Sequence, residues 1–342
     1  MRREDAEEIG RALLRWYRRN RRDLPWRGRR DPYRVWVSEV MLQQTTVRAV
    51  IPYYRRFLRR FPSLRSLACA SDRSVLASWS GLGYYRRALN LRAAAAMIIR
   101  RHGGRFPREL REALALPGVG RSTAGAVLSI AFGRRLPVLD GNIVRVLSRL
   151  ALLRGATRGG RGEKRLWGLA GLLVERTSSP GELNQALMEL GATLCTPVGP
   201  ACRACPLARR CAARAAGLQD AIPTPRRRRA AVVVRSRLAL VTRAGRHLMR
   251  RRRGTGLLDG TWEFPTMASR PRRDGLRLRS QGRIATIRHT ITYRRMLVDV
   301  HRARLLAEPR GGAYRWLEPE RIRRLPVSSL VLKVLGSVSG EV

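Results

Sequence analysis

LPGVGRSTAGAVLSIAFGRRLPVLDGN, residues 116–142, is the stretch that decides the fold of this chain. A helix that ends at Leu116, a turn with Gly118 and Gly120, and a new helix from about Ser122 are typical of a helix-hairpin-helix. Glycine lets a backbone approach a ligand closely, and N–H groups at a helix N-terminus attract anions. In a basic chain, this turn is predicted to bind a nucleic-acid phosphate.

Asp140 stands between the extended apolar residues 136–139 and an apolar helix that begins near Ile143. A carboxylate at this junction has two interpretations. It caps the helix by accepting N–H groups of the first turn, or it is a catalytic carboxylate beside a bound strand. The local sequence leaves both open.

The charge of the chain indicates a polyanionic partner. Lys and Arg number 71 against 24 Asp and Glu, a net charge of +47, and only Lys164 and Lys333 are lysine. This charge favours nucleic acid through counterion release and steering, although an arginine bias in a GC-rich genome would explain part of it. No signal peptide and no apolar run near ~20 residues is evident, so we expect a soluble, cytoplasmic protein without a membrane partner.

Asp31 and Pro32 are a good helix start, and the predicted helix continues through Thr45. Glu39 shares an apolar face of this helix with neighbours at i−4 and i+3. Burial raises the pKa of a carboxyl toward a value that suits proton donation near neutral pH. Glu39 is therefore a candidate acid, and the alternative is a buried glutamate paired with an arginine.

Four cysteines, Cys195, Cys202, Cys205 and Cys211, lie within seventeen residues at spacings x6, x2 and x5. Disulfides are rare inside cells, so four clustered thiols indicate a metal site. Both a tetrahedral zinc and a [4Fe-4S] cluster take four cysteines, and the spacing alone does not choose. Cys69 lies outside this group and is predicted to be a buried thiol.

Taken together, these motifs resemble the helix-hairpin-helix DNA glycosylase superfamily and, within it, the MutY-type adenine glycosylases. SEVMLQQT, residues 38–45, matches that family almost residue for residue. The resemblance implies a mostly α fold: a two-lobed helical glycosylase module with an iron-sulfur loop at 1–215 (loop 195–211), a basic linker at 216–230, and an α+β Nudix-like domain at 231–342 that reads the opposite base.

The family implies a monofunctional glycosylase that excises adenine mispaired with 8-oxoguanine or guanine in duplex DNA, acting as a monomer in base excision repair. By resemblance, Glu39 protonates the flipped adenine, and Asp140 stabilises the oxocarbenium-like sugar with Asn142 as a helper. The cysteine spacing matches the glycosylase [4Fe-4S] loop, with zinc as the second choice.

The resemblance also implies substrate and DNA contacts, by Trp26, Arg27, Gln43, Gln44, Tyr84, Gly118, Gly120, Ser122, Gln185 and Thr292. Tyr84, one of two tyrosines predicted to be exposed after Gly83, would be a wedge between base pairs. Gln185 would pair with the adenine edge through its amide. Structural alternatives are ordinary packing for Trp26, Tyr84 and Gln185, and a polar helix end for Gln43 and Gln44.

Ser122 decides the expected reaction type. Relatives that also cut the strand carry a lysine directly after the hairpin turn, which forms a Schiff base with the sugar. A hydroxyl forms no imine, and no lysine precedes Lys164, so we expect an abasic product. The alternatives are an endonuclease-III-like glycosylase/lyase for oxidised pyrimidines and a non-catalytic DNA-binding protein.

Beyond the linker, strand-like alternation sets in, with a hairpin turn at Ala244-Gly245. GLLDGTWEFP, residues 256–265, resembles the Nudix-like domain of the family, but no glutamate-rich box follows, so we expect no pyrophosphatase activity. Ile291, Thr292 and Tyr293 replace the family's Phe-Ser-His triplet, which leaves the strength of the 8-oxoguanine preference open.

Overall fold

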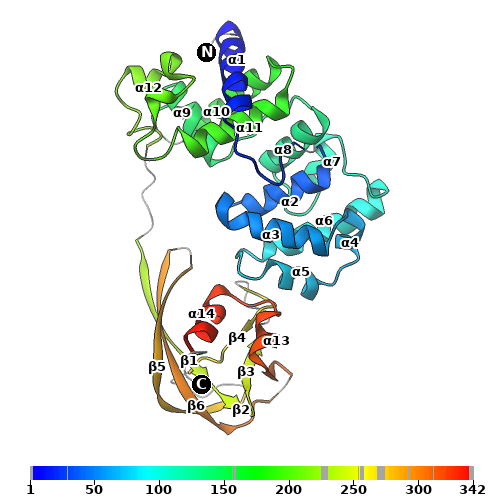
Figure 1. Ribbon diagram of the computed structural model, residues 1–342, viewed down its shortest axis with the longest axis vertical. Helices are drawn as coiled ribbons and strands as arrows, with labels where there is room; N and C mark the ends of the chain where they lie inside the picture. Colours follow the sequence, from blue (N-terminus) through cyan, green and yellow to red (C-terminus); the bar gives the residue numbers. More distant parts are fainter. Residues whose placement is uncertain are drawn as a thin grey trace. The chain divides into compact units, whose positions relative to one another are not determined.

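The computed structural model describes residues 3–28, 30–155, 157, 159–224, 230–252, 254, 258–267, 274–291, 293–310 and 312–338. Contacts divide the chain into two compact units. The first contains Met1–Leu58, Ser63–Ala68 and Ala93–Arg227, and the second contains Arg59–Pro62, Cys69–Arg92 and Arg228–Val342. The first unit is helical, and the second combines a helical segment with all the described strands (Figure 1).

The first unit is built from short and medium helices: α1 (Arg3–Asn20), α2 (Pro32–Leu42), α3 (Val47–Arg60), α4 (Leu64–Ala68), α7 (Leu110–Leu114), α8 (Arg121–Phe132), α9 (Gly141–Leu150), α10 (Gly160–Glu175), α11 (Pro180–Thr193) and α12 (Ala212–Ala215). Helix α6 (Arg86–His102) runs from the second unit into the first. None of the described helices combines the length and the apolar character that a membrane crossing requires.

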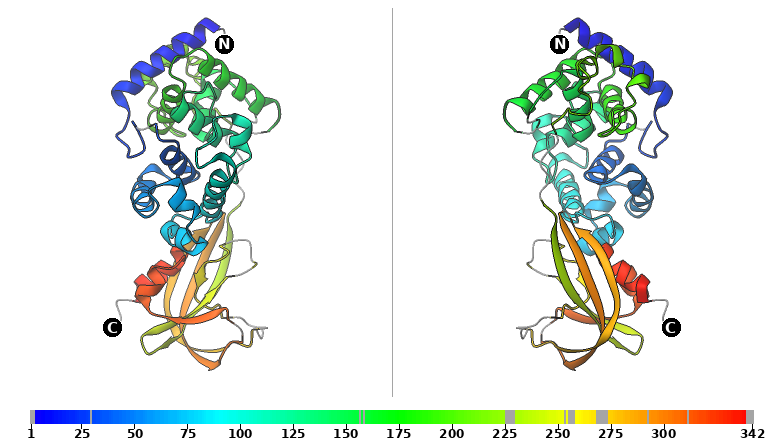
Figure 2. Two further views of the ribbon diagram at one scale, coloured as in Figure 1. Left: turned by 90° about the vertical axis from the view of Figure 1, so that its right-hand side faces the viewer. Right: turned by 90° about the vertical axis from the view of Figure 1, so that its left-hand side faces the viewer.

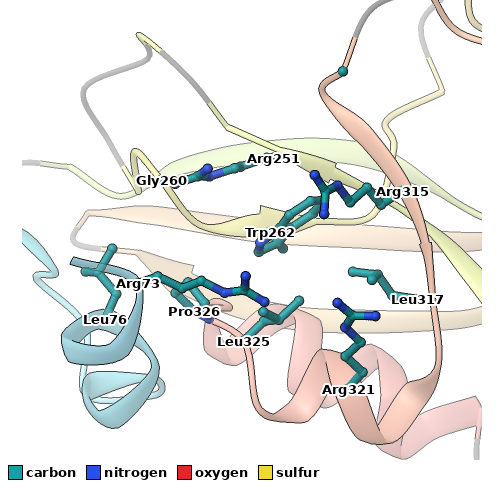
Figure 3. A pocket seen from close by; sticks show the side chains of 11 residues that line it. Arg73, Leu76, Arg251, Gly260, Trp262, Arg315, Leu317, Arg321, Leu325 and Pro326 are labelled. Atoms are coloured by element: carbon teal, nitrogen blue, oxygen red, sulfur yellow. The ribbon is translucent and has the colours of Figure 1, made fainter. Parts of the chain in front are cut away.

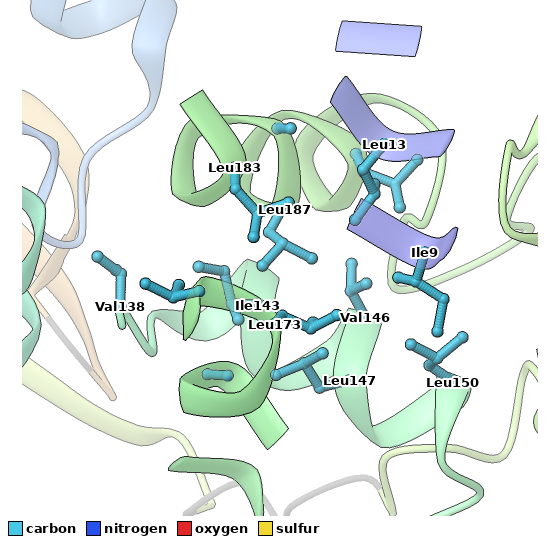
Figure 4. Packing of buried hydrophobic residues seen from close by; sticks show 14 of the residues in the cluster. Ile9, Leu13, Val138, Ile143, Val146, Leu147, Leu150, Leu173, Leu183 and Leu187 are labelled. Carbon is cyan, nitrogen blue, oxygen red and sulfur yellow. The ribbon is translucent and has the colours of Figure 1, made fainter. Parts of the chain in front are cut away.

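A single apolar core holds α1, α9, α10 and α11 together. Figure 4 shows its side chains, among them Ile9, Leu13, Ile143, Val146, Leu147, Leu173, Leu183 and Leu187. Burying each such side chain stabilises the fold by about 1.5–3 kcal/mol. Gly191 lets α11 approach α9 closely, because a Cβ there would lie 2.6 Å from the Cβ of Asn142.

The helix-hairpin-helix is formed by α7, a short turn and α8. Helix α7 ends at Leu114, two residues before the predicted end, because Ala115 and Leu116 form tighter turns to Glu112 and Ala113. Gly118 has φ +75°, a left-handed conformation that favours glycine. Gly120 is the N-cap of α8, which starts at Arg121.

The second unit contains two sheets formed by β1 (Val232–Leu240), β2 (Thr242–Arg243), β3 (Arg246–Arg251), β4 (Trp262–Glu263), β5 (Arg277–Ile291), β6 (Arg294–Ala307) and β7 (Tyr314–Leu317). The sheet of three long strands has the order β1-β6-β5, with β1 parallel and β5 antiparallel to β6. In the four-stranded sheet of short strands β3 pairs with β2, β4 and β7, and the predicted turn at Ala244-Gly245 joins β2 to β3.

Helices α13 (Pro319–Arg323) and α14 (Ser329–Val338) complete this unit, and Figure 2 shows α14, in red, beside the long strands. Helix α5 (Asp72–Trp79) and the turn after it belong to the same unit.

The Tyr85 hydroxyl donates to the Val327 carbonyl at 2.5 Å, so Tyr85 is buried and the prediction that it is exposed is wrong. Cys69 is exposed, contrary to the prediction of a buried thiol.

Candidate active site

A cavity of about 590 Å³ in the helical unit gathers many of the residues that the sequence singles out. It lies between α2, α8, α11 and the loop that follows α1. The sequence-predicted residues in its lining are Trp26, Arg27, Glu39, Gln43, Ser122, Asp140, Asn142 and Gln185. Its volume is within the range of roughly 300–1,000 Å³ that is usual for ligand sites.

Glu39 projects from the last turn of α2 into this cavity. Its carboxyl forms no hydrogen bond or ion pair with the described residues. Among these residues, the alternative interpretation of a glutamate paired with an arginine is therefore wrong. Burial, and then the negative charge of Asp140, raise the pKa of Glu39 to about 7. At pH 7 about half of the Glu39 carboxyls are therefore protonated, far more than for an ordinary glutamate.

Asp140 faces the same cavity but is surrounded by donors. It is the N-cap of α9: one carboxylate oxygen accepts the Ile143 N–H at 2.8 Å, and the other accepts the Asn142 amide at 3.1 Å. Burial raises the pKa of Asp140, while these hydrogen bonds and the Arg145 cation oppose the rise. The cap interpretation is therefore confirmed, and it leaves the carboxylate beside the cavity.

Arg27 is held by a carboxylate that the sequence interpretation missed. Glu189 of α11, with a side chain only 1% exposed, accepts Arg27 Nη2 at 2.6 Å and Arg22 Nη2 and Nε at 2.7 and 2.8 Å. Burial works to raise the pKa of Glu189, but hydrogen bonds from Arg22 and Arg27 lower it to about 2. A signal was present: Glu182, Gln185 and Glu189 fall on one face of a helix at i, i+3 and i+7.

Gln185 lines the cavity and also contacts the helix bundle. Its Oε1 accepts the Tyr17 hydroxyl at 3.1 Å, and its Nε2 donates to the Gly181 carbonyl at 3.2 Å. Arg27 lies over the Tyr17 ring at 5.4 Å. The amide is thus oriented by α1 and α11, and a ligand that pairs with it has to displace or share these partners.

Trp26 is 8% exposed and packs edge-on against Tyr54 at 5.3 Å while it lines the cavity.

The predicted continuation of the glutamate-bearing helix to Thr45 is wrong, because α2 ends at Leu42 and Gln44 takes a left-handed φ of +58°. Gln43 lines the cavity and donates to the Thr123 hydroxyl at 3.2 Å. Gln44 is exposed and lies outside the lining.

Ser122 sits at the start of α8, where its hydroxyl donates to the Leu139 carbonyl at 2.9 Å, next to Asp140. The described lining of the cavity contains no lysine. Lys164 lines a different hollow with Arg121 and Trp167. Gly118 and Gly120 lie in the hairpin turn and are not part of the cavity lining.

The four predicted metal ligands are half-buried cysteines, free of disulfide bonds, in the loop between α11 and α12. Burial raises the pKa of Cys205 to about 11, and negative charge on Cys195, Cys211 and Cys202 adds to the rise. A guanidinium NH of Arg149, a residue 2% exposed, lies 3.3 Å from Cys195 Sγ. In the described part of the chain, no three His, Cys, Asp or Glu side chains converge tightly enough to hold a single metal ion.

Another cavity, of about 740 Å³, lies in the other unit and is bordered by Tyr84, Arg87, His289, Thr290 and Ile291, among others. Tyr84 is 47% exposed, so it is not the core tyrosine of the alternative interpretation. Its φ of +49° is left-handed, which is strained for a tyrosine. Thr292 lies outside the described residues.

Comparisons with known proteins agree with this architecture. Residues 37–170 match the model of the HhH-GPD superfamily base excision DNA repair proteins, and residues 237–337 match a NUDIX domain. A solved thermostable thymine-DNA glycosylase is 30% identical with a TM-score of 0.55, covering 62% of this chain and 98% of its own. An endonuclease III–DNA complex, 21% identical, has a TM-score of 0.53 over 64% of this chain and 99% of its own, and shows the fold alone.

The chain thus has a base-excision glycosylase fold joined to a Nudix-like domain, as the sequence predicts. Curated adenine DNA glycosylases are similar to it: the Schizosaccharomyces pombe protein is 34% identical over 77% of this chain and 70% of its own length, and the Homo sapiens protein 48% identical over 59% and 39%. The chain belongs to the adenine DNA glycosylase family. It spans about half the length of the curated relatives it matches.

Proposed function

We propose that the protein excises adenine from duplex DNA by cleaving the N-glycosidic bond, where the adenine is mispaired with 8-oxoguanine or guanine. The observation that carries this proposal is the pair of carboxyls in one cavity. Glu39 has no hydrogen-bond partner among the described residues and a pKa of about 7, whereas Asp140 accepts two hydrogen bonds. Two carboxyls with such different surroundings suit an acid and an anion at neutral pH.

Adenine inside a duplex is out of reach, so it has to flip into the cavity. Glu39 donates its proton to N7 of the flipped base, and the electron pair of the glycosidic bond moves to N9 as the base leaves. The sugar becomes oxocarbenium-like, and the Asp140 carboxylate stabilises its positive charge. Water then adds to the sugar carbon, its hydroxide remains there, and its proton returns to a carboxylate.

Specificity for adenine is proposed to come from Trp26, Arg27 and Gln185. Trp26 supplies an aromatic surface for the flipped base, because it lines the cavity and is fixed against Tyr54. Arg27, fixed by Glu189, and the oriented amide of Gln185 supply hydrogen-bonding groups. Asn142 orients Asp140 through its amide.

We propose that the product is an intact strand with an abasic site. Ser122 occupies the position after the hairpin turn, and its hydroxyl is engaged with Leu139. An imine with the sugar needs an amine, and the described cavity lining offers no lysine. Contact with DNA phosphate by the turn at Gly118 and Gly120 is part of the same proposal.

Recognition of the opposite base is proposed for the second unit. Tyr84, exposed and left-handed, is suited to enter the base stack, and it shares its cavity with Thr290 and Ile291, directly before Thr292. The proposed organisation is a glycosylase module at 1–215, a linker at 216–230 and a reading domain at 231–342, acting as a monomer. Gln43 and Gln44, at the end of α2, are proposed to contact the duplex.

The cysteine loop is proposed to hold a [4Fe-4S] cluster through Cys195, Cys202, Cys205 and Cys211. The chemistry of the donor set fits: one loop supplies the four thiols that such a cluster takes, and the buried Arg149 guanidinium lies beside Cys195. When bound, the cluster supplies a structural cross-link and no ligand to the base chemistry. The loop itself carries Arg203, Arg209 and Arg210, whose side chains are proposed to meet DNA phosphate. Arg210 pairs with Glu8 of α1, so it would have to exchange that partner for the phosphate. Zinc is the alternative group.

A substrate panel tests the function. Duplexes that carry adenine opposite 8-oxoguanine, adenine opposite guanine, or an oxidised pyrimidine are incubated with excess enzyme, with and without alkali. We expect breaks at adenine only after alkali treatment. Alkali-independent breaks at the oxidised pyrimidine would identify the endonuclease-III-like alternative, and binding without any product would identify a non-catalytic DNA-binding protein.

A further inference from the structure

Besides the cavity at Tyr84, the strand-containing unit has a much smaller one, of about 90 Å³, that plays no part in the proposed reaction. Four arginines from four separate elements line it: Arg73 of α5, Arg251 of β3, Arg315 of β7 and Arg321 of α13. Figure 3 shows the guanidinium groups of Arg73, Arg315 and Arg321 directed toward the space around Trp262. We call this set the arginine pocket.

No carboxylate is among the described residues that line the arginine pocket. Within the described residues, none of its four guanidinium groups pairs with a carboxylate. The carboxylates that flank the pocket residues in sequence pair with other arginines: Asp72 with Arg92, Glu263 with Arg250 and Arg252, Glu318 with Arg246, and Glu320 with Arg323. Like charges around one hollow repel each other, so an anion in the pocket would stabilise this arrangement.

The walls of the pocket are fixed. The Ser80 hydroxyl donates to the Val327 carbonyl at 3.0 Å, next to Pro326, which lines the pocket. The backbone N–H of Trp262 donates to the Pro326 carbonyl at 2.8 Å. The segment with α5 is therefore tied to the segment after α13, and the arginines project from a preformed rim rather than from loose loops.

Size restricts the ligand. The cavity is well below the roughly 300 Å³ of sites that enclose whole drug-sized molecules, so a nucleobase or a nucleoside does not fit inside it. A single tetrahedral oxyanion is small enough, and guanidinium groups match its oxygens with charge-assisted hydrogen bonds.

We propose that the arginine pocket binds one phosphate group. Arg73, Arg315 and Arg321 donate to its oxygens, and Arg251 adds positive charge at the edge. The phosphate belongs either to the backbone of duplex DNA or to a free phosphate ion or ester, since the recognising chemistry is the same. This site is separate from the glycosylase cavity and does not depend on the adenine chemistry proposed above.

The test uses the full chain and inorganic phosphate, titrated by calorimetry at constant ionic strength with chloride as the compensating anion. The double variant R315Q/R321Q should bind phosphate at least about tenfold more weakly than the wild type, because charged hydrogen bonds to phosphate are lost. R73Q/R251Q, which alters the opposite side of the rim, should show a loss in the same direction.

The matched control is R277Q/R279Q, which removes the same charge from exposed positions on β5. Its phosphate affinity should change less than about twofold, as screening alone would give. Equal phosphate binding by the wild type, both pocket variants and the control would overturn the proposal. Thermal unfolding of each variant checks that it is folded.

Duplex binding across a range of salt concentrations then identifies the source of the phosphate. If the pocket takes a backbone phosphate, the plot of log K for duplex binding against log salt should be less steep for R315Q/R321Q than for the wild type. The magnitude of its negative slope should fall by about 0.9, which corresponds to one phosphate contact. If it takes free phosphate, the slope equals that of R277Q/R279Q while phosphate binding is lost. Both results support the pocket, and only the first gives it a role on DNA.

Discussion

Arg27 Nη2 lies 2.6 Å from a carboxylate oxygen of Glu189, 162 residues later in the chain, and both side chains are nearly buried. The same carboxylate accepts the backbone N–H and two guanidinium nitrogens of Arg22. The loop that carries Trp26 and Arg27 is therefore anchored to α11, the helix that carries Gln185. Two walls of the proposed adenine site are joined through one carboxylate, that of Glu189, which pairs with both arginines.

Replacing Glu189 with glutamine should destabilise the protein by about 3 kcal/mol, because it leaves two cations without their buried partner. It should also lower the single-turnover rate of adenine excision by about tenfold or more, through misplacement of Arg27. Urea unfolding and a rate measurement well below the melting temperature separate the two effects.

The control for this variant is Glu182→Gln, which removes the more exposed Arg18–Glu182 pair on the same helix. That loss should cost less than about 1 kcal/mol and leave the rate unchanged. Identical behaviour of the two variants would show that Glu189 holds nothing that the reaction needs.

The rate of excision should depend on pH as a bell. Glu39, with a pKa of about 7, has to be protonated, so the rate falls about tenfold per pH unit well above pH 7. Asp140 has to be ionised, and because its pKa is raised, the acid limb should lie above the ordinary aspartate range. A single-turnover profile from pH 4.5 to 9 measures both limbs, and a rate that is flat between pH 7 and 9 would exclude Glu39 as the acid.

Glu39→Gln should stabilise the protein at alkaline pH. Since the folded state binds the Glu39 proton more tightly than the unfolded chain, folding stability falls as pH rises from about 4.5 to about 7. At 1.36 kcal/mol per pKa unit, the cost at pH 8 is about 3 kcal/mol. The free energy of unfolding of E39Q minus that of wild type should therefore be near zero at pH 4 and positive at pH 8. A constant difference would contradict the raised pKa.

Much of the fold follows from local sequence. The Asp31-Pro32 start of α2, the two-glycine turn and the Ala244-Gly245 hairpin each depend on backbone preferences of a few neighbouring residues. The end of α2 does not follow, because Gln44 is held in a left-handed conformation that its own preference does not predict.

The site was only partly predictable, for a physical reason. Glu39 and Asp140 are acidic residues next to apolar neighbours, which the sequence itself shows to be unusual. Glu189 is important because it pairs with Arg22 and Arg27, which are distant from it in sequence. The burial of Tyr85 likewise depends on Val327. Partners that tertiary packing brings together leave little trace in any one segment.

Cys202→Ser should lower the iron content and the stability of the purified protein together. A [4Fe-4S] cluster predicts about four irons per wild-type chain and visible absorbance that the variant loses. The control is Cys69→Ser, which alters the exposed cysteine outside the loop and should change neither quantity. About one zinc per chain and no iron would instead select the alternative metal.

The central claim is that Glu39 donates the proton that releases adenine. The most direct measurement is single-turnover excision of adenine opposite 8-oxoguanine by wild type and E39Q, each at enzyme concentrations shown to saturate the duplex. The account predicts that E39Q binds the duplex within about threefold of wild type and excises at least about a hundredfold more slowly, the scale of general-acid catalysis. Excision by E39Q at the wild-type rate would contradict it.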